Sequence, residues 1–208
     1  MRLNKQELIN ASYFGHFKQT VYSLGYEFYK FWIDNRILSD QDIARMLEAE
    51  LASELVIAML VGIQSRKVLE KYYKKYDNEF PEKATVTEKF KHTMDLIGEI
   101  TENRLGTSSF SSKHLFYSLY CSIYDLCYGL PGTQTERIQF DSRVKPRVAN
   151  TLWDIDTLLE MDISEIQDPQ QLRFVSASTR RTTDMSARKT RHEYITGRVL
   201  GDLQPRRA

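Results

Sequence analysis

Side chains that bind phosphate well are concentrated near the end of the chain. The segment Ser178-Thr179-Arg180-Arg181-Thr182-Thr183 combines hydroxyl and guanidinium groups, both of which donate hydrogen bonds to phosphate oxygens. Arg188 and Arg191 follow on one side of a predicted helix. Residues 173–207 hold nine Lys or Arg against three Asp or Glu, a local charge of +6 in a chain whose total is +1. The rest of the chain is therefore net acidic by −5, and this asymmetry indicates an acidic partner, most commonly nucleic acid.

Two interpretations of these arginines remain open. In the first, the phosphates of double-stranded DNA are contacted by Arg180, Arg181, Arg188 and Arg191, and each contact adds a salt-sensitive increment to the affinity. In the second, the arginine stems flank an apolar stripe that includes Ile195 and leave their charged heads in water or against a partner protein. The salt dependence of DNA binding separates the two interpretations.

An acidic cluster is a candidate for metal binding, because paired carboxylates can hold Mg²⁺. It consists of Asp154, Asp156, Glu160 and Asp162. Asp156 and Glu160 lie one helical turn apart. The alternative is that the cluster forms the solvent-facing side of an amphipathic helix. Because Mg²⁺ sites also need a substrate phosphate or further carboxylates, we predict no metal site. A metal-dependent enzyme that uses Asp156 and Glu160 remains a rival hypothesis.

Other patterns of catalytic residues are missing from the sequence. Four scattered histidines include no pair at the spacing of metal ligands: His16, His92, His114 and His192. The sequence has no phosphate-binding P-loop, GxGxxG, GxSxG or CxxC motif. We therefore predict no catalytic residue and no cofactor, and we expect this chain by itself not to be an enzyme.

The spacing of apolar residues predicts helices along almost the whole chain. With 41% hydrophobic and 27% charged residues, the composition is that of a soluble globular protein. No segment alternates apolar and polar residues as a strand does, so we predict an all-α fold, a compact orthogonal array of about seven to nine helices without a sustained β-sheet. Capping signatures mark three helix starts, at Asn4 with Glu7, Ser39 with Asp42 and Thr85 with Glu88.

The helical segments are expected to form one body. We predict a helical domain over residues 1–165 and a basic helical segment over residues 166–208 that packs on the same domain. The aromatic-rich segment from Tyr26 to Ile33 is expected to lie deep in the core. Residues 130–142, which contain Pro131 and Gly132, are the best candidate for a mobile loop.

Cysteine usage and hydropathy indicate the compartment. Cys121 and Cys127 lie six residues apart in a predicted helix, which places them on different faces and prevents a disulfide between them. The N-terminus has no apolar segment of a signal peptide, and the longest apolar run, from Leu55 to Ile63, is too short to span a bilayer. We expect a reduced, cytoplasmic protein with no membrane contact.

The beginning of the chain carries a resemblance to a known family. Leu3-Asn4-Lys5-Gln6-Glu7-Leu8-Ile9-Asn10-Ala11, followed by Gly15-His16-Phe17, is similar to the LNxQELRNAxxxGxF stretch of the ParB-like, GmrSD-type family of bacterial restriction and phage-defence proteins. Further similar stretches follow in the same order, and together they cover nearly the whole chain: residues 36–40, 62–67, 69–73, 110–119 and 173–191.

The resemblance implies a role in defence without the part that carries the chemistry. In that family the opening stretch follows a β-rich core with a DGQQR-type motif, which is associated with nucleotide-dependent sensing or nuclease activity, and no such motif occurs here. We expect a non-catalytic helical module that contacts DNA, a ParB-like or nuclease partner, or a second copy of itself. The alternative is a stand-alone interaction or dimerisation subunit that binds no nucleic acid. The residues expected to face a partner are Asn4, Gln6, Glu7, Phe14 and Phe17, with Leu8 beside them.

Overall fold

The computed structural model describes residues 4–204, so Leu3, Arg206 and Arg207 lie outside the described part of the chain. Helices make up 73% of the structure, and the described residues contain nine helices of seven or more residues and no strand, which confirms the all-α prediction. None of these helices is both long enough and apolar enough to cross a membrane. The α-helices are α1 (Lys5–Ser12), α2 (His16–Glu27), α3 (Tyr29–Asp34), α4 (Asp40–Ile43), α5 (Leu47–Val61), α6 (Leu69–Lys75), α7 (Lys83–Thr101), α8 (Lys113–Tyr128), α9 (Val144–Glu160), α10 (Pro169–Thr179) and α11 (Met185–Leu203).

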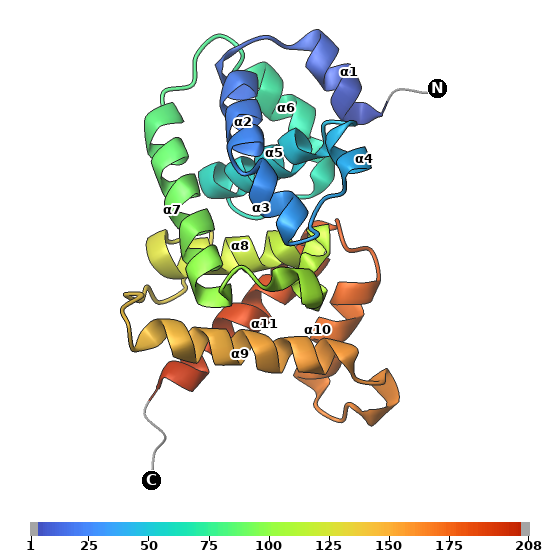
Figure 1. Cartoon of the computed structure of the whole chain (residues 1–208), viewed down its shortest axis with the longest axis vertical. Coiled ribbons are helices and arrows are strands. Elements are labelled where there is room, and N and C mark those ends of the chain that lie inside the picture. Colours follow the sequence, from blue (N-terminus) through green and yellow to red (C-terminus); the bar gives the residue numbers. More distant parts are fainter. Residues whose placement is uncertain (1–3, 205–208) are drawn as a thin grey trace.

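Two buried helices organise the molecule. Helix α5 lies in the upper half with α1 to α4 and α6 around it, and α8 crosses the middle above α9 and α10, while α7 runs down one side past both α5 and α8 (Figure 1). Both helices bury residues on nearly all sides, as helices inside a core do. Helices α10 and α11 contribute Phe174, Ile195 and Val199 to the same hydrophobic core, so the basic C-terminal segment packs against the rest.

Two of the three predicted helix starts have the expected capping geometry. The Asn4 side chain accepts from the backbone N–H of Glu7, and the Glu7 carboxylate accepts from the backbone N–H of Asn4. Ser39 and Asp42 form the second capping box. The prediction at Thr85 is wrong, because α7 already begins at Lys83. A backbone hydrogen bond from Val86 to the carbonyl of Glu82 adds that earlier turn.

The aromatic segment that follows α2 is only partly buried. Trp32 is completely buried, and its indole N–H donates to the carbonyl of Gly25 at 2.9 Å. Tyr26, by contrast, is 80% exposed, so the prediction of a deeply packed segment is wrong for this residue. Helix α2 continues through Glu27 before the chain turns at Phe28, and this continuation leaves Tyr26 on the outer side of the helix.

Cys121 and Cys127 are both free, as predicted. Burial raises the pKa of each thiol to about 12. At pH 8 about one thiol in ten thousand is then ionised, and only the thiolate is nucleophilic. We expect no reaction of the native protein with Ellman's reagent at pH 8, and release of two equivalents after unfolding in guanidinium chloride. A thiol that reacts at pH 8 without denaturant would contradict the complete burial of Cys121 or the raised pKa of half-buried Cys127.

Candidate functional site

Arg191 holds the connection between α10 and α11 from inside the protein. Its side chain is completely buried. One terminal nitrogen donates to the carbonyl of Ala177 at 2.6 Å, the other donates to the carbonyl of Thr182 at 2.7 Å, and Nε donates to Ser118 Oγ on α8 at 2.8 Å. Burial and the neighbouring Arg188 guanidinium lower the pKa of Arg191 to about 10, which still leaves it charged at neutral pH. The guanidinium therefore ties the last turn of α10, at Ala177, and the middle of the connection, at Thr182, to the core.

Arg188 is also directed inward. It is 4% exposed, forms an ion pair with Glu54 of α5, donates to the carbonyl of Gln64 at 3.0 Å and lies over the ring of Tyr117 at 4.0 Å from the centroid. Burial alone would lower the pKa of Arg188, but the Glu54 carboxylate raises it above the ordinary value. The side chain thus links α11 to α5 and α8 as a buried, paired cation.

The four arginines predicted to contact DNA do not form one surface. Arg188 and Arg191 use their guanidinium groups within the fold, so the prediction of phosphate contacts is corrected for these two residues. Arg180 and Arg181 are both exposed on the connection between α10 and α11. Within residues 4–204 neither takes part in an ion pair. They therefore remain candidates for a nucleic-acid contact.

A cavity of about 260 Å³ lies beside this connection and is lined by Thr182 and Thr183 together with residues of α5, α8 and α11. Two cations on its wall are half-exposed but are neutralised locally. Arg66 pairs with Glu50, and Lys113 pairs with Asp42 at 2.9 Å. Arg180 and Arg181, which have no ion-pair partner among residues 4–204, directly precede Thr182 and Thr183 in the chain.

A larger cavity of about 520 Å³ lies on another face of α11, between that helix, the end of α5 and residues 131–135. His192 lines it, and His192 Nε2 lies 2.8 Å from Asp125 Oδ2 of α8, although neither atom has a partner with hydrogen-bond geometry. The other carboxylate oxygen of Asp125 accepts from the backbone N–H of Leu130 at 2.5 Å and from Thr133 Oγ1 at 2.8 Å. The pair therefore joins α8, α11 and the segment after α8.

The charge state of Asp125 follows from these contacts. Burial would raise its pKa, but the interactions with His192, Thr135, the Leu130 N–H and Thr133 outweigh burial and lower the pKa below the ordinary value. An ionised aspartate can orient an imidazole for proton transfer. The described lining of the cavity contains no Ser or Cys that His192 could activate as a nucleophile. The sequence held one signal for this pair, because Asp125 is the one acidic residue of α8.

The acidic cluster of α9 serves the fold. Asp156 Oδ1 accepts from the backbone N–H of Ser109 at 2.7 Å and so attaches α9 to the turn before α8. Asp154 and Glu160 are exposed, and Asp162 caps the short turn that follows α9. Within the described residues, no group of three or more His, Cys, Asp or Glu side chains is arranged to hold a metal ion.

The five residues predicted to face a partner have different roles. Asn4 and Glu7 form the capping box of α1, and Asn4 Nδ2 also donates to the carbonyl of Arg45 at 3.0 Å. Gln6 is buried and donates to Tyr73 Oη at 3.0 Å, and Phe17 is completely buried, so the prediction is corrected for these two residues. Phe17 packs in the core against the rings of three aromatic residues, Tyr73, Tyr76 and Phe80.

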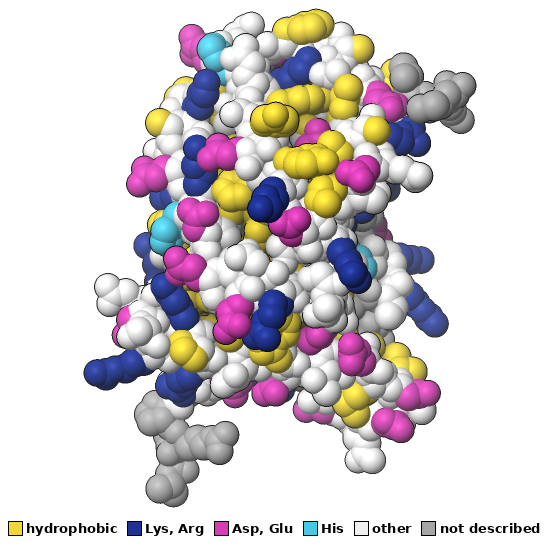
Figure 2. All heavy atoms as spheres, viewed as in Figure 1, with side chains coloured by type: hydrophobic (Ala, Val, Ile, Leu, Met, Phe, Trp, Pro, Cys, Tyr) yellow, Lys and Arg dark blue, Asp and Glu magenta, His cyan; other side chains and the backbone are white. Residues whose placement is uncertain are grey.

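Phe14 is the exception, because 71% of its surface is exposed. Three other large apolar side chains of this region are exposed as well: Leu8 (52%), Tyr26 (80%) and Tyr29 (40%). Hydrophobic side chains gather over α1 to α3 in the upper half of the face shown in Figure 2. We call the outer side of α2 with Phe14 and Tyr29 the aromatic face.

Comparison of the chain with models of known protein families, with curated protein sequences and with solved structures found no match. The structure by itself defines an all-α protein with an exposed arginine pair on the connection between α10 and α11 and with an aromatic face around α2. The likeness to the ParB-like, GmrSD-type family is a resemblance of short sequence stretches alone.

Proposed function

We propose that this chain is a non-catalytic helical module of a bacterial anti-phage or restriction-type defence protein, and that it contacts double-stranded DNA through the connection between α10 and α11. The observation that supports the DNA contact is the exposure of Arg180 and Arg181 on a connection that buried Arg191 holds through the carbonyl of Thr182. A surface that is already ordered loses less conformational entropy when it binds. The sequence resemblance supports the role in defence.

The chemistry of the connection suits a phosphate backbone. Two guanidinium groups without an ion-pair partner in the described chain, those of Arg180 and Arg181, directly precede the hydroxyl-bearing Thr182 and Thr183 in the chain. Such groups bind phosphate oxygens without reading the base sequence, so the contact would position the module on DNA and would not select a site.

Replacement of Arg180 and Arg181 together by Ala tests the proposal. Each phosphate contact contributes a slope of about 0.9 to the dependence of log affinity on log salt, so we expect the variant to lose roughly two units of slope. Fluorescence anisotropy with labelled duplex DNA, between about 50 and about 200 mM salt, measures the change.

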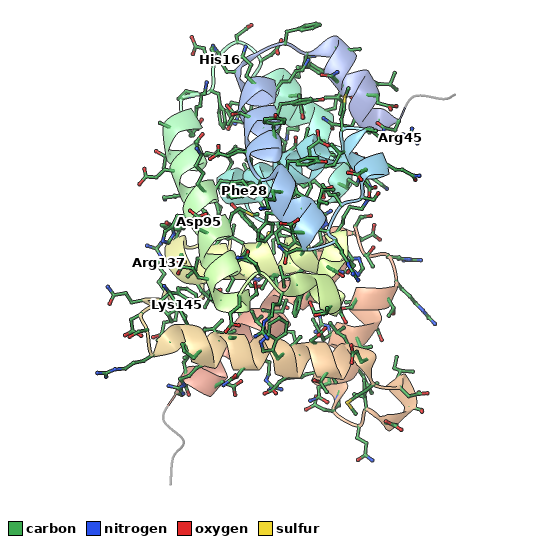
Figure 3. All side chains as sticks on the ribbon, viewed as in Figure 1. His16, Phe28, Arg45, Asp95, Arg137 and Lys145 are labelled. Atoms are coloured by element: carbon green, nitrogen blue, oxygen red, sulfur yellow. The ribbon has the colours of Figure 1, made fainter. Side chains whose placement is uncertain are left out.

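A matched control is the replacement of Arg137 and Arg143 by Ala. Both are exposed, and Arg137 lies on the side of the molecule opposite to the connection between α10 and α11 (Figure 3). The control should leave the slope unchanged, although it removes the same net charge. Absence of binding by the wild-type chain at about 50 mM salt, or equal slopes for the two double variants, would count against the DNA contact.

A second candidate function is contact with another protein through the aromatic face. The exposed fractions of Phe14 and Tyr26, 71% and 80%, favour it, since large apolar side chains clustered on a surface commonly mark interaction sites. In the resembled family the corresponding stretch follows a β-rich core, so a separately encoded ParB-like half is one partner that this surface could receive.

A further inference from the structure

The cavity of about 520 Å³ beside α11 has one wall that consists of a single side of that helix. This wall includes Lys189, His192, Glu193, Thr196 and Gly197. His192 and Thr196 are 3% and 5% exposed and so lie at its inner part, whereas Lys189 and Glu193 are exposed at its edge. The facing wall is the end of α5 together with residues 131–135. Sites for small molecules range from about 300 to 1,000 Å³, so the cavity has the size of such a site.

Gly197 leaves the backbone of α11 bare within this wall. A Cβ added at Gly197 would meet no neighbouring side chain or segment within 4 Å, so packing inside the chain does not require a glycine here. A glycine in a helix is nevertheless less favourable than an alanine. What the missing side chain provides is space, because a ligand in the cavity can approach the helix backbone closely at a glycine.

Two opposite charges stand one helical turn apart at the edge of the cavity. Neither Lys189 nor Glu193 forms an ion pair within residues 4–204. A lysine four residues before a glutamate is the less favourable order for a pair within one helix. A ligand with only negative charge would meet Glu193, and a ligand with only positive charge would meet Lys189. The two residues together therefore favour a ligand that carries both charges.

The facing wall offers amide groups that are free to form hydrogen bonds. The backbone N–H groups of Gly132, Gln134 and Thr135 have no partner among the described residues, and the Gln134 side chain has none either. These residues belong to an irregular segment, in which no neighbouring turn of a helix uses their backbone groups. Amide groups of this kind bind carboxylates and peptide groups well.

The apolar part of the lining is aliphatic. It consists of Val61, Ile63, Pro131, Met185 and Leu200. Apart from the imidazole of His192, the described lining contains no aromatic ring. A nucleobase therefore finds no Phe, Tyr or Trp ring on which to stack, whereas aliphatic side chains find matching surface.

We propose that this cavity binds a small zwitterion with aliphatic side chains, either an aliphatic amino acid or a short peptide of such residues. The carboxylate of the ligand pairs with Lys189, its ammonium group pairs with Glu193, and its main chain passes over Gly197 toward the free amides of residues 132–135. This site goes beyond the proposed function. Neither the arginine pair of the DNA contact nor the aromatic face takes part in it, so each proposal fails independently of the others.

Isothermal titration calorimetry of the whole chain with two probes tests the proposal. The probes are leucine and the tripeptide alanyl-leucyl-alanine, each titrated up to about 10 mM, which covers dissociation constants into the millimolar range. Binding of leucine would identify an amino-acid site, and binding of the tripeptide alone would identify a peptide site. Absence of binding by both probes would overturn the proposal.

Filling the cavity locates the binding. Gly197→Leu places a side chain in the space that the ligand is expected to use, and we expect it to weaken binding by about tenfold or more. Gly201→Leu is the matched control, because Gly201 lies on the same helix, has the same free space at its Cβ and does not line the cavity. The control should bind as the wild type does, and circular dichroism checks that both variants are folded. Binding that survives Gly197→Leu would place the ligand elsewhere and refute the site.

Blocked probes identify the charged partners without relying on Gly197. Amidation of the probe's carboxylate should weaken binding to the wild type about fivefold and should have no further effect on Lys189→Met, which keeps an apolar stem without the charge. Acetylation of the probe's amine should behave in the same way with Glu193→Gln.

Two results of these experiments would contradict the assignment. One is a blocked probe that loses as much affinity in the matching variant as in the wild type. The other is adenosine monophosphate, an anion with an aromatic base, that binds more tightly than both zwitterions and is displaced by Gly197→Leu.

Discussion

Replacement of Arg191 by Ala is expected to lower the free energy of unfolding by about 3–5 kcal/mol, because it leaves three buried acceptors without their donor at about 1–3 kcal/mol each. The completely buried guanidinium donates to two carbonyls and one hydroxyl. The variant leaves the carbonyls of Ala177 and Thr182 and the hydroxyl of Ser118 without this donor. Buried polar groups that lose their partners account for much of the expected loss.

Urea unfolding followed by fluorescence measures this change, since Trp32 is completely buried and reports on the core. For a chain of this size each kcal/mol should also lower the melting temperature by about 2–4 °C. Lys189→Ala is the matched control, because Lys189 is an exposed cation on the same helix and should change the free energy of unfolding by less than about 0.5 kcal/mol. Equal stability of the two variants would show that Arg191 does not hold the connection.

Replacement of Phe17 by Ala is expected to cost about 3–5 kcal/mol, as large-to-small changes of buried phenylalanines do. The ring is completely buried and lies 5.0 Å from Tyr73, 5.9 Å from Tyr76 and 5.5 Å from Phe80, measured between ring centroids. The cavity left by the ring cannot close fully, because its neighbours are large aromatic side chains from other segments.

The same change at Phe14 provides the comparison. Phe14 is 71% exposed and has Lys18 over its ring, so Phe14→Ala should cost less than about 1 kcal/mol. Parallel urea titrations of the two variants measure the difference. If Phe14→Ala proves as costly as Phe17→Ala, the assignment of Phe14 to the surface is wrong.

These two predictions concern residues that look alike in the sequence. Phe14 and Phe17 both belong to the stretch that resembles the defence family. Arg180 and Arg181, like Arg188 and Arg191, belong to the basic C-terminal segment. Phe17, Arg188 and Arg191 are buried and stabilise the fold. Phe14, Arg180 and Arg181 are exposed and can contact a partner. The DNA contact is accordingly proposed for Arg180 and Arg181, and contact with another protein for the aromatic face. Arg191 is expected to affect DNA binding only through the position of the connection.

Local patterns were sufficient for most of the helices. The capping box at Asn4 depends on residues three positions apart, and the end of α5 at Gly62 depends on the left-handed backbone of that glycine, with φ of 80°. Such signals act within one turn and can be recognised without knowledge of the rest of the chain. The wrong start of α7 at Thr85 has the same origin, because a capping signature inside a helix resembles one at its beginning.

The sequence by itself determined the all-α class, most helix limits and the charge asymmetry, since these depend on composition and on neighbours within a few positions. Tertiary structure alone decided which arginines are free. Arg188 pairs with Glu54, 134 residues earlier in the chain, and His192 faces Asp125 across two helices. Helical periodicity places a residue on one side of its helix but does not say what covers that side. Burial depends on contacts between distant segments, and those contacts separated the residues that hold this protein together from those that can meet a partner.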